Sequence, residues 1–339
     1  MTKGSAFPRA SDSPRCLVPY ARPVIPDALI SRRGWCRLRQ VAGVVPEGLS
    51  RAPALIECRL DGRSSLADVS FEVAPHLPCL GPLACDVRSR LAMGWLEFDS
   101  GTEPGRAPSR FFTPAHVLEP SRPWQVCRSE VLDLLLRIRE TAGARTAATD
   151  RFAAAETAIH RLPAGCKVRQ IGLMESRSPI GIRLCLSGFE KVPGPILVEW
   201  LEGAGYRGLA GALGRSRDVL KSLSDHLDLA VDAVDGNGSR AGWEIQLSRR
   251  NPRTEERWPR LLAALGLYAP LRPEKERALL NVFGSLRMPG WEDAAEPGAC
   301  FLVFCINHLK VVFDSHRGSA VKAYLKVASY RKASGTEVA

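Results

Sequence analysis

The chain has 339 residues, of which 45% are apolar and 24% charged, a balance typical of a globular protein with a sizeable core. No stretch approaches the roughly 18 uninterrupted apolar residues that a membrane-spanning helix needs. The first residues also lack an apolar segment followed by a small-residue cleavage site, so we expect a cytoplasmic protein without a membrane partner.

The formal net charge of +11 is unevenly distributed. Residues 1–51 carry nine Lys or Arg against three Asp or Glu, a net of +6, which leaves +5 for the rest of the chain. Residues 1–27 also hold five prolines without any apolar period, which predicts a disordered basic arm that is dispensable for folding. Such an arm could bind an anionic partner or could simply be solvated.

The ten cysteines are scattered, lie mostly in apolar surroundings, and include no CxxC pair. This pattern is typical of buried reduced thiols and not of a zinc site or a disulfide framework. We therefore expect all ten thiols to be free.

After the arm, residues 28–41 indicate a short basic helix. Period-two alternation then begins: Ile56, Cys58 and Leu60 alternate with polar residues, and after a turn at 62–65 the segment 69–73 does the same. This predicts a hairpin with one apolar and one polar face. The segment 95–99 alternates again, and a loop over 100–110 leads to a brief apolar run at Phe111 and Phe112.

The rest of the chain is more regular. Helical spacing predicts helices at 127–140, 147–161, 194–204, 209–227, 255–265 and 273–283. Alternation predicts strands at 168–176, 181–187, 229–235, 242–249, 300–314 and 320–328. Helix–helix–strand–strand thus occurs three times at a period of roughly 60 residues, without a residue-level repeat.

The predicted fold class is α+β, with about five hairpins, or ten antiparallel strands, in a single domain over 28–330 and a disordered tail at 331–339. A strand that packs on helices outside and lines a solvated lumen inside must alternate in this way. An open sheet with one solvent-exposed face would give the same alternation, so the pattern alone does not decide between a barrel and an open sheet.

This order of elements over residues 54–328 resembles the α-β-β-α barrel of the aromatic prenyltransferases. The resemblance implies ten antiparallel strands closed into a wide barrel, with helices outside and an isoprenoid diphosphate and an aromatic acceptor in the polar lumen. It also implies that Lys, Arg and Tyr side chains on the strands bind the diphosphate without an aspartate-rich motif, and no such motif occurs here.

Cations and a tyrosine stand at inward-type positions of the predicted strands. Lys322, Tyr324 and Lys326 share one face of a strand, and His308 and Lys310 share a face of the preceding one. The candidate diphosphate-binding residues are Arg59, Arg183, Lys310, Lys322, Tyr324 and Lys326. We expect Lys310, Lys322 and Arg183 to form a cluster of cations that lacks partner charges until an anion binds. Alternatively, these residues are ordinary solvated charges.

Glu97 is the candidate catalytic residue, because the resemblance implies an early-strand glutamate that accepts a hydrogen bond from the acceptor and acts as a base. Asp99, Glu57 and Glu244 are competitors of the same type. His308 and His316 bracket Asp314, but neither a serine elbow nor a metal spacing accompanies them. The glycine-rich segment 201–214 lies between two predicted helices, so we interpret it as a turn and not as a phosphate-binding loop.

The leading hypothesis is a prenyltransferase that transfers an isoprenoid from its diphosphate to an aromatic or peptide side chain in natural-product biosynthesis. No protein-bound metal is predicted, and the pattern leaves open whether Mg²⁺ accompanies the diphosphate as a cofactor. The alternative is a non-catalytic peptide-binding or maturation accessory protein that uses its basic arm and strand-face charges. Nucleic-acid binding would rest on net charge alone and is not expected.

Overall fold

The fold was analysed in a computed structural model of the chain. The residues that the structure describes are 17–45, 53–62, 66–75, 78–80, 88–99, 107–119, 121–141, 149–177, 180–233, 240–288 and 298–333. Residues 1–16 of the predicted arm and residues 334–339 of the predicted tail lie outside these ranges.

Ten of the described strands close into one antiparallel barrel. The strands are β1 (Ala54–Arg59), β2 (Ala67–Val73), β3 (Leu91–Phe98), β4 (Ser109–Pro114), β5 (Lys167–Met174), β6 (Gly181–Ser187), β7 (His226–Ala233), β8 (Arg240–Gln246), β10 (Gly298–Asp314) and β11 (Gly318–Ala333). Each pairs with the next in this order, and β11 pairs with both β10 and β1, so the sheet has no free edge within the ring. The closed barrel, and not the open sheet, is therefore the correct alternative.

The alternation seen in the sequence separates the two faces of the barrel. In β2, Val69, Phe71 and Val73 are buried against the outer layer, while Ser70 and Glu72 face the lumen. The apolar face must be covered to be removed from water, whereas polar side chains can remain solvated or paired inside. Many of the side chains that line the lumen are therefore polar or charged, although β3 and β4 also contribute apolar ones.

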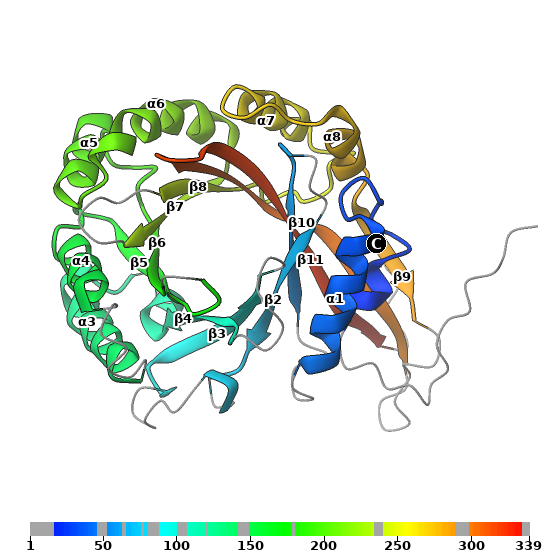
Figure 1. Ribbon diagram of the computed structural model, residues 1–339, viewed down its shortest axis with the longest axis horizontal. Coiled ribbons are helices and arrows are strands. Elements are labelled where there is room, and N and C mark those ends of the chain that lie inside the picture. Colours follow the sequence, from blue (N-terminus) through cyan, green and yellow to red (C-terminus); the bar gives the residue numbers. More distant parts are fainter. Residues whose placement is uncertain are drawn as a thin grey trace, which may run out of the picture.

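Helix pairs cover most of the outside of the barrel (Figure 1). The helices are α3 (Trp124–Thr141), α4 (Thr149–His160), α5 (Gly194–Gly203), α6 (Arg207–Leu223), α7 (Arg257–Gly266) and α8 (Pro273–Leu280). In α6, Leu209, Leu213 and Leu220 are buried toward the sheet, and Ser216 Oγ accepts a hydrogen bond of 3.0 Å from Trp243 Nε1 of β8. The threefold helix–helix–strand–strand order is thus confirmed.

The N-terminal segment 17–27 packs into the core, which corrects the predicted length of the disordered arm. Leu17, Val18, Ala21 and Ile25 are at most 2% exposed. Val18 and Ala21 belong to a short 3₁₀ helix, η1 (Val18–Ala21), that contacts β10 and the helix α1 (Arg32–Val44). The prediction of disorder was wrong for this segment because prolines do not prevent the apolar side chains between them from being buried.

The strand β9 (Phe283–Arg287) was not predicted from the sequence. It pairs with residues 301–305 of β10, whose 17 residues extend beyond the barrel together with β11. Helix α8 ends at Leu280 and not at 283 as predicted, and β11 continues to Ala333 instead of ending before a tail at 331. The end of α8 was predicted too late because the alternation in β9 is short and directly follows the helix.

Two further predictions concern the whole chain. Among the eight cysteines that the structure describes, none forms a disulfide with another, and the other two, Cys16 and Cys85, lie outside the described residues. Among the described helices, none combines the length and the apolar character needed to span a lipid bilayer.

We predict that Ile25→Ala lowers the free energy of unfolding by about 2–5 kcal/mol, because it leaves a cavity among fully buried apolar side chains. Urea denaturation would measure the change. Arg22→Ala, an exposed position in the same segment, is the matched control and should stay within about 0.5 kcal/mol of the parent protein. Equal stability of all three proteins would instead support the dispensable arm.

Candidate active site

The interior of the barrel contains a cavity of about 320 Å³. Its lining includes one wall of mainly apolar side chains from β3, β4 and the short helix η4 (Ala115–Leu118): Met93, Trp95, Phe111 and Val117. A second wall, mainly polar and basic, comes from β8, β10, β11 and the residues after β8: Glu244, Arg250, Asn307, His308, Lys310, Tyr324 and Lys326. The lumen therefore has two chemically different sides.

These two walls face each other because of the strand order. Counted round the ten-stranded ring, β3 and β8 are five strands apart, as are β4 and β10. Gly172 of β5 helps to shape the apolar wall, since a Cβ atom at this position would lie 2.6 Å from the Phe111 ring. Any larger residue there would require the Phe111 ring to shift.

Two of the predicted cations line the cavity and already have carboxylate partners. Lys310 Nζ lies 2.7 Å from Glu244 Oε1, and Arg183 donates two hydrogen bonds of 2.6 and 2.9 Å to Asp232. Burial opposes the ionisation of Glu244, but Lys310, His308 and Arg169 together outweigh it and lower the pKa of Glu244 to about 2. Arg183 likewise holds the pKa of Asp232 below its usual range despite burial.

Lys322 and Tyr324 share a third buried carboxylate, Glu57 of β1. Lys322 Nζ and Tyr324 Oη both donate hydrogen bonds to Glu57, one to each oxygen. Burial alone would raise the pKa of Glu57, but Lys322 and these hydrogen bonds lower it well below its usual range. Burial, followed by the Glu57 charge, raises the pKa of Tyr324.

The expectation of a cation cluster without partner charges is therefore wrong. Each cation of the proposed cluster forms an ion pair with a carboxylate on a neighbouring strand. The physical reason is that a buried, unpaired charge is costly, and barrel closure buries these side chains.

The other two predicted binding residues differ in their placement. Lys326 lines the cavity and forms no ion pair with any carboxylate in the described part of the chain. Arg59 does not join the cavity: it stands at the end of β1, its side chain is 49% exposed, and it pairs with Asp61 at 2.6 Å.

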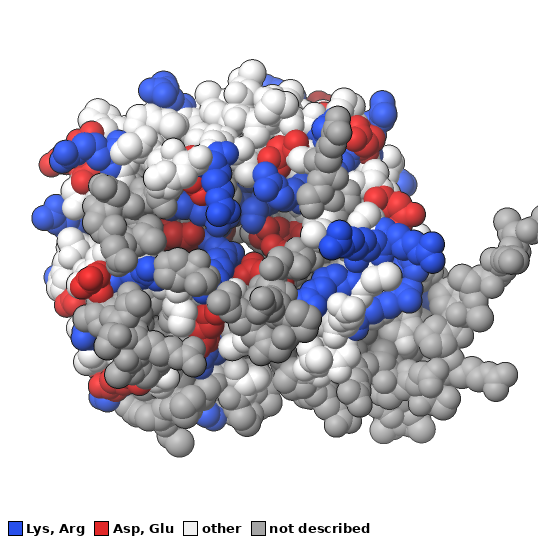
Figure 2. Space-filling view, in the orientation of Figure 1, with Lys and Arg blue, Asp and Glu red and all other residues white. Residues whose placement is uncertain are grey.

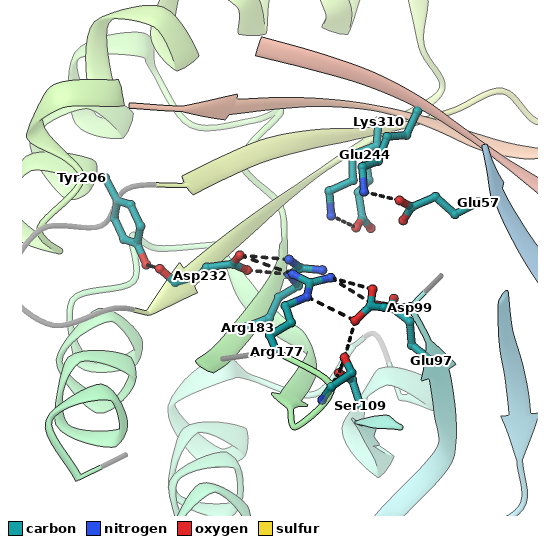
Figure 3. A network of polar contacts seen from close by, with 12 residues as sticks. Glu57, Glu97, Asp99, Ser109, Arg177, Arg183, Tyr206, Asp232, Glu244 and Lys310 are labelled. Atoms are coloured by element: carbon teal, nitrogen blue, oxygen red, sulfur yellow. Dashed lines mark hydrogen bonds and ion pairs between the residues drawn. The ribbon is translucent and has the colours of Figure 1, made fainter. Parts of the chain in front are cut away.

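Glu97 of β3 lines the cavity beside the apolar wall, 3.1 Å from Arg177 Nη2. Figure 3 shows Arg177 with Asp232 on one side and Asp99 and Glu97 on the other. Burial, and then the like charge of Asp99, raise the pKa of Glu97 although Arg177 opposes them. Since the pKa values of Glu57 and Glu244 are lowered, Glu97 is the best proton acceptor of these three buried glutamates.

Several polar residues of the lumen were not predicted. Asp228 of β7 forms an ion pair with Arg169, and burial raises the pKa of Asp228 to about 6 in spite of this cation. Asn307 and His308 are neighbours in sequence and yet both line the cavity, because a β-bulge interrupts the register of β10 between Ile306 and His308. Strict alternation places Asn307 on the outer face, so no signal in the sequence identified it.

The described residues contain no group of three or more His, Cys, Asp or Glu side chains arranged to hold a metal ion. The carboxylates of the lumen are instead bound by Lys and Arg, which does not fit a protein-bound metal centre there.

Comparison with known proteins finds similarity only in structure. No family model and no curated sequence matches the chain. The apo form of the prenyltransferase PriB aligns with a TM-score of 0.50 at 11% identity, over 96% of this chain and 100% of that chain. 5-Dimethylallyltryptophan synthase from Streptomyces coelicolor gives 0.49 at 12%, over 94% and 97%. AnaPT from Neosartorya fischeri gives 0.44 at 11%, over 81% and 77%.

The chain therefore has the α-β-β-α barrel fold of a prenyltransferase, as the order of elements in the sequence predicted. At this level of identity the similarity establishes the fold alone, and any activity must be argued from the side chains of the lumen.

We predict that Lys322→Ala lowers the free energy of unfolding by about 3–5 kcal/mol, because it leaves the Glu57 carboxylate buried without its cation. Lys326→Ala, on the same face of β11 but without a described carboxylate partner, should change stability much less. The double variant Glu57→Gln, Lys322→Met should recover most of the loss. Thermal and urea unfolding would measure all three, and a neutral Lys322→Ala would contradict the buried ion pair.

Proposed function

We propose that this protein is a prenyltransferase that transfers an isoprenoid from its diphosphate to an aromatic or peptide side chain, in the tailoring of a natural product. The observation that carries the proposal is the barrel cavity with a basic wall opposite an apolar, aromatic wall, and with a buried glutamate beside the latter. An isoprenoid diphosphate has the matching amphiphilic chemistry, an anionic head and an apolar chain. The prenyltransferase fold of PriB supports the same class of reaction.

The basic wall would bind the diphosphate. Lys326 and Arg250 are the cations of this wall that form no ion pair with a described carboxylate, so they can neutralise a new anion at the lowest cost. Lys310 and Arg183 lie on the same lumen surface, and their carboxylate partners leave some of their N–H donors available. Together these groups would stabilise the negative charge that develops on the leaving diphosphate.

The apolar wall would hold the isoprenoid chain. When the carbon–oxygen bond to the diphosphate breaks, its electron pair leaves with the diphosphate oxygen and an allylic cation remains. The ring faces of Trp95 and Phe111 can stabilise such a cation and exclude water from it.

Glu97 would complete the reaction as the general base. The π electrons or a lone pair of the acceptor form the new bond to the allylic carbon, and the acceptor then loses a proton. The Glu97 carboxylate, with its raised pKa and its place at the apolar wall, is suited to accept that proton. The products are the prenylated acceptor and diphosphate.

A second candidate, a non-catalytic peptide-binding or maturation accessory protein, is favoured by a different observation. Arg32, Arg33 and Arg39 are exposed on α1, and Figure 2 shows a basic patch over this helix, beside the opening of the barrel. An enclosed lumen with buried charges is not needed for such a role, whereas it is needed for prenyl transfer. The closed barrel therefore favours the prenyltransferase over the accessory protein.

Titration calorimetry with dimethylallyl or geranyl diphosphate tests the first step. We expect saturable binding with a one-to-one stoichiometry, reduced at least about tenfold in Lys326→Ala through the loss of one charged hydrogen bond. Arg32→Ala, on the basic patch of α1, is the control and should bind as the parent does. If only weak, salt-dependent binding occurs and Arg32→Ala weakens it equally, the accessory protein becomes the better proposal.

We further predict that Glu97→Gln lowers the rate of transfer by about 10²–10⁴-fold while inorganic pyrophosphate still binds. A base must be ionised, so the rate should rise with pH through the raised pKa of Glu97. Asp99→Asn removes the neighbouring like charge and should shift this rise to lower pH. Product formation across pH would measure both effects, and an unchanged pH profile in Asp99→Asn would argue against Glu97 as the base.

A further inference from the structure

Three neighbouring polar side chains of the basic wall form a hydrogen-bonded chain. Arg250 Nη1 lies 2.5 Å from Asn307 Oδ1, and Asn307 Nδ2 lies 2.9 Å from His308 Nδ1. The β-bulge in β10 makes this chain possible, because it places Asn307 and His308 on the same side of the strand. All three residues line the cavity.

This chain determines which nitrogen of His308 carries the proton. A guanidinium can only donate, so the Asn307 atom that faces Arg250 must be the amide oxygen. The amide nitrogen of Asn307 therefore faces His308, and it too can only donate. His308 Nδ1 must then be the unprotonated nitrogen, which leaves the proton of the neutral ring on Nε2.

The surroundings of His308 keep the ring neutral and fixed in orientation. Its ring stacks on Tyr324 with centroids 4.0 Å apart and an angle of 16° between the planes. The side chain is buried, and this burial, assisted by the Lys310 charge, lowers the pKa of His308 to about 4 although Glu244 opposes the shift. Nε2 has no hydrogen-bond partner among the described residues, whereas Nδ1 is bonded to Asn307.

We propose that His308 presents a fixed Nε2–H donor to an anionic oxygen of the substrate, and that Arg250 and Asn307 are positioning residues that hold it in this tautomer. The inference rests on the proposed function, because the ligand is an oxygen bound at the same basic wall. That oxygen belongs either to the diphosphate or to a carboxylate of the acceptor. In both cases His308 donates a hydrogen bond without transferring its proton.

The arrangement suits an anion better than a cation or an apolar group. Lys326 and Arg250 line the cavity with His308 and have no described carboxylate partner, so this wall is positive without any charge on the imidazole. A neutral donor adds a directed hydrogen bond to this field and does not repel the neighbouring cations, as an imidazolium would.

The tautomer can be tested by NMR on the intact protein labelled with ¹⁵N-histidine. His308→Gln identifies the His308 signals among the six histidines of the chain. We expect the shifts of a neutral ring protonated at Nε2 at pH 7, and Asn307→Asp should move the proton to Nδ1, because a carboxylate can only accept. His116, whose Nε2 forms its hydrogen bond with the Val168 carbonyl oxygen, should keep its signals. An imidazolium or an Nδ1-protonated ring in the parent protein would overturn the inference.

The role of the donor can be tested by calorimetry with inorganic pyrophosphate and, separately, with L-tryptophan. His308→Phe keeps an aromatic ring against Tyr324 but has no donor, whereas His308→Gln can place an amide N–H near the position of Nε2. We expect His308→Phe to lower the affinity for one of the two probes by about tenfold or more, and His308→Gln to retain most of that affinity. The probe affected identifies whether the oxygen belongs to the diphosphate or to the acceptor.

These outcomes separate this inference from the proposed function. If the parent protein binds neither probe saturably, the proposed function fails at its first step. If the parent binds pyrophosphate and His308→Phe binds each probe as tightly as the parent does, the basic wall binds the anion without His308, and the inference is wrong.

Discussion

The pairing of β11 with both β10 and β1 is the interaction on which the rest of the structure depends. It joins the last strand of the chain to the first and converts a ten-stranded sheet into a closed barrel. In an open sheet, the polar face would be solvated and its charges would be screened. Closure instead encloses that face, so that every charged side chain on it must find a partner or remain solvated in the cavity.

The ion pairs of the lumen follow from this constraint. Lys310, Lys322 and Arg183 each meet a carboxylate on an adjacent strand, because an unpaired charge in a closed lumen would cost more than the pairing does. The pairs also decide which groups stay available for chemistry. Lys326 and Arg250 keep free positive charge on one wall, and Glu97 keeps a raised pKa on the other. The positions of the proposed diphosphate site and of the proposed base are thus set by the groups that the ion pairs leave without a partner.

A second feature, the β-bulge of β10, breaks the regularity that the barrel otherwise imposes. Ten regular strands would line the lumen with every second residue only. The bulge adds Asn307 beside His308, and Asn307 then links His308 to Arg250. Bulges of this kind occur next to active sites because they redirect a side chain without disturbing the neighbouring strands. Here the bulge gives the imidazole a defined tautomer.

The sequence by itself determined the order of the elements except β9, the five hairpins and, away from the bulge in β10, the inner face of the strands, because periodicity is a local property of the chain. It therefore placed Lys310, Tyr324 and Glu97 inside correctly. Only the tertiary structure decided that the sheet closes, that Lys322 pairs with Glu57, which lies 265 residues away, and that Ile25 is buried. These depend on register and on contacts between distant segments, as does the exclusion of Arg59 from the cavity. Alternation gives a side chain its face, but only the neighbouring strand gives it a partner.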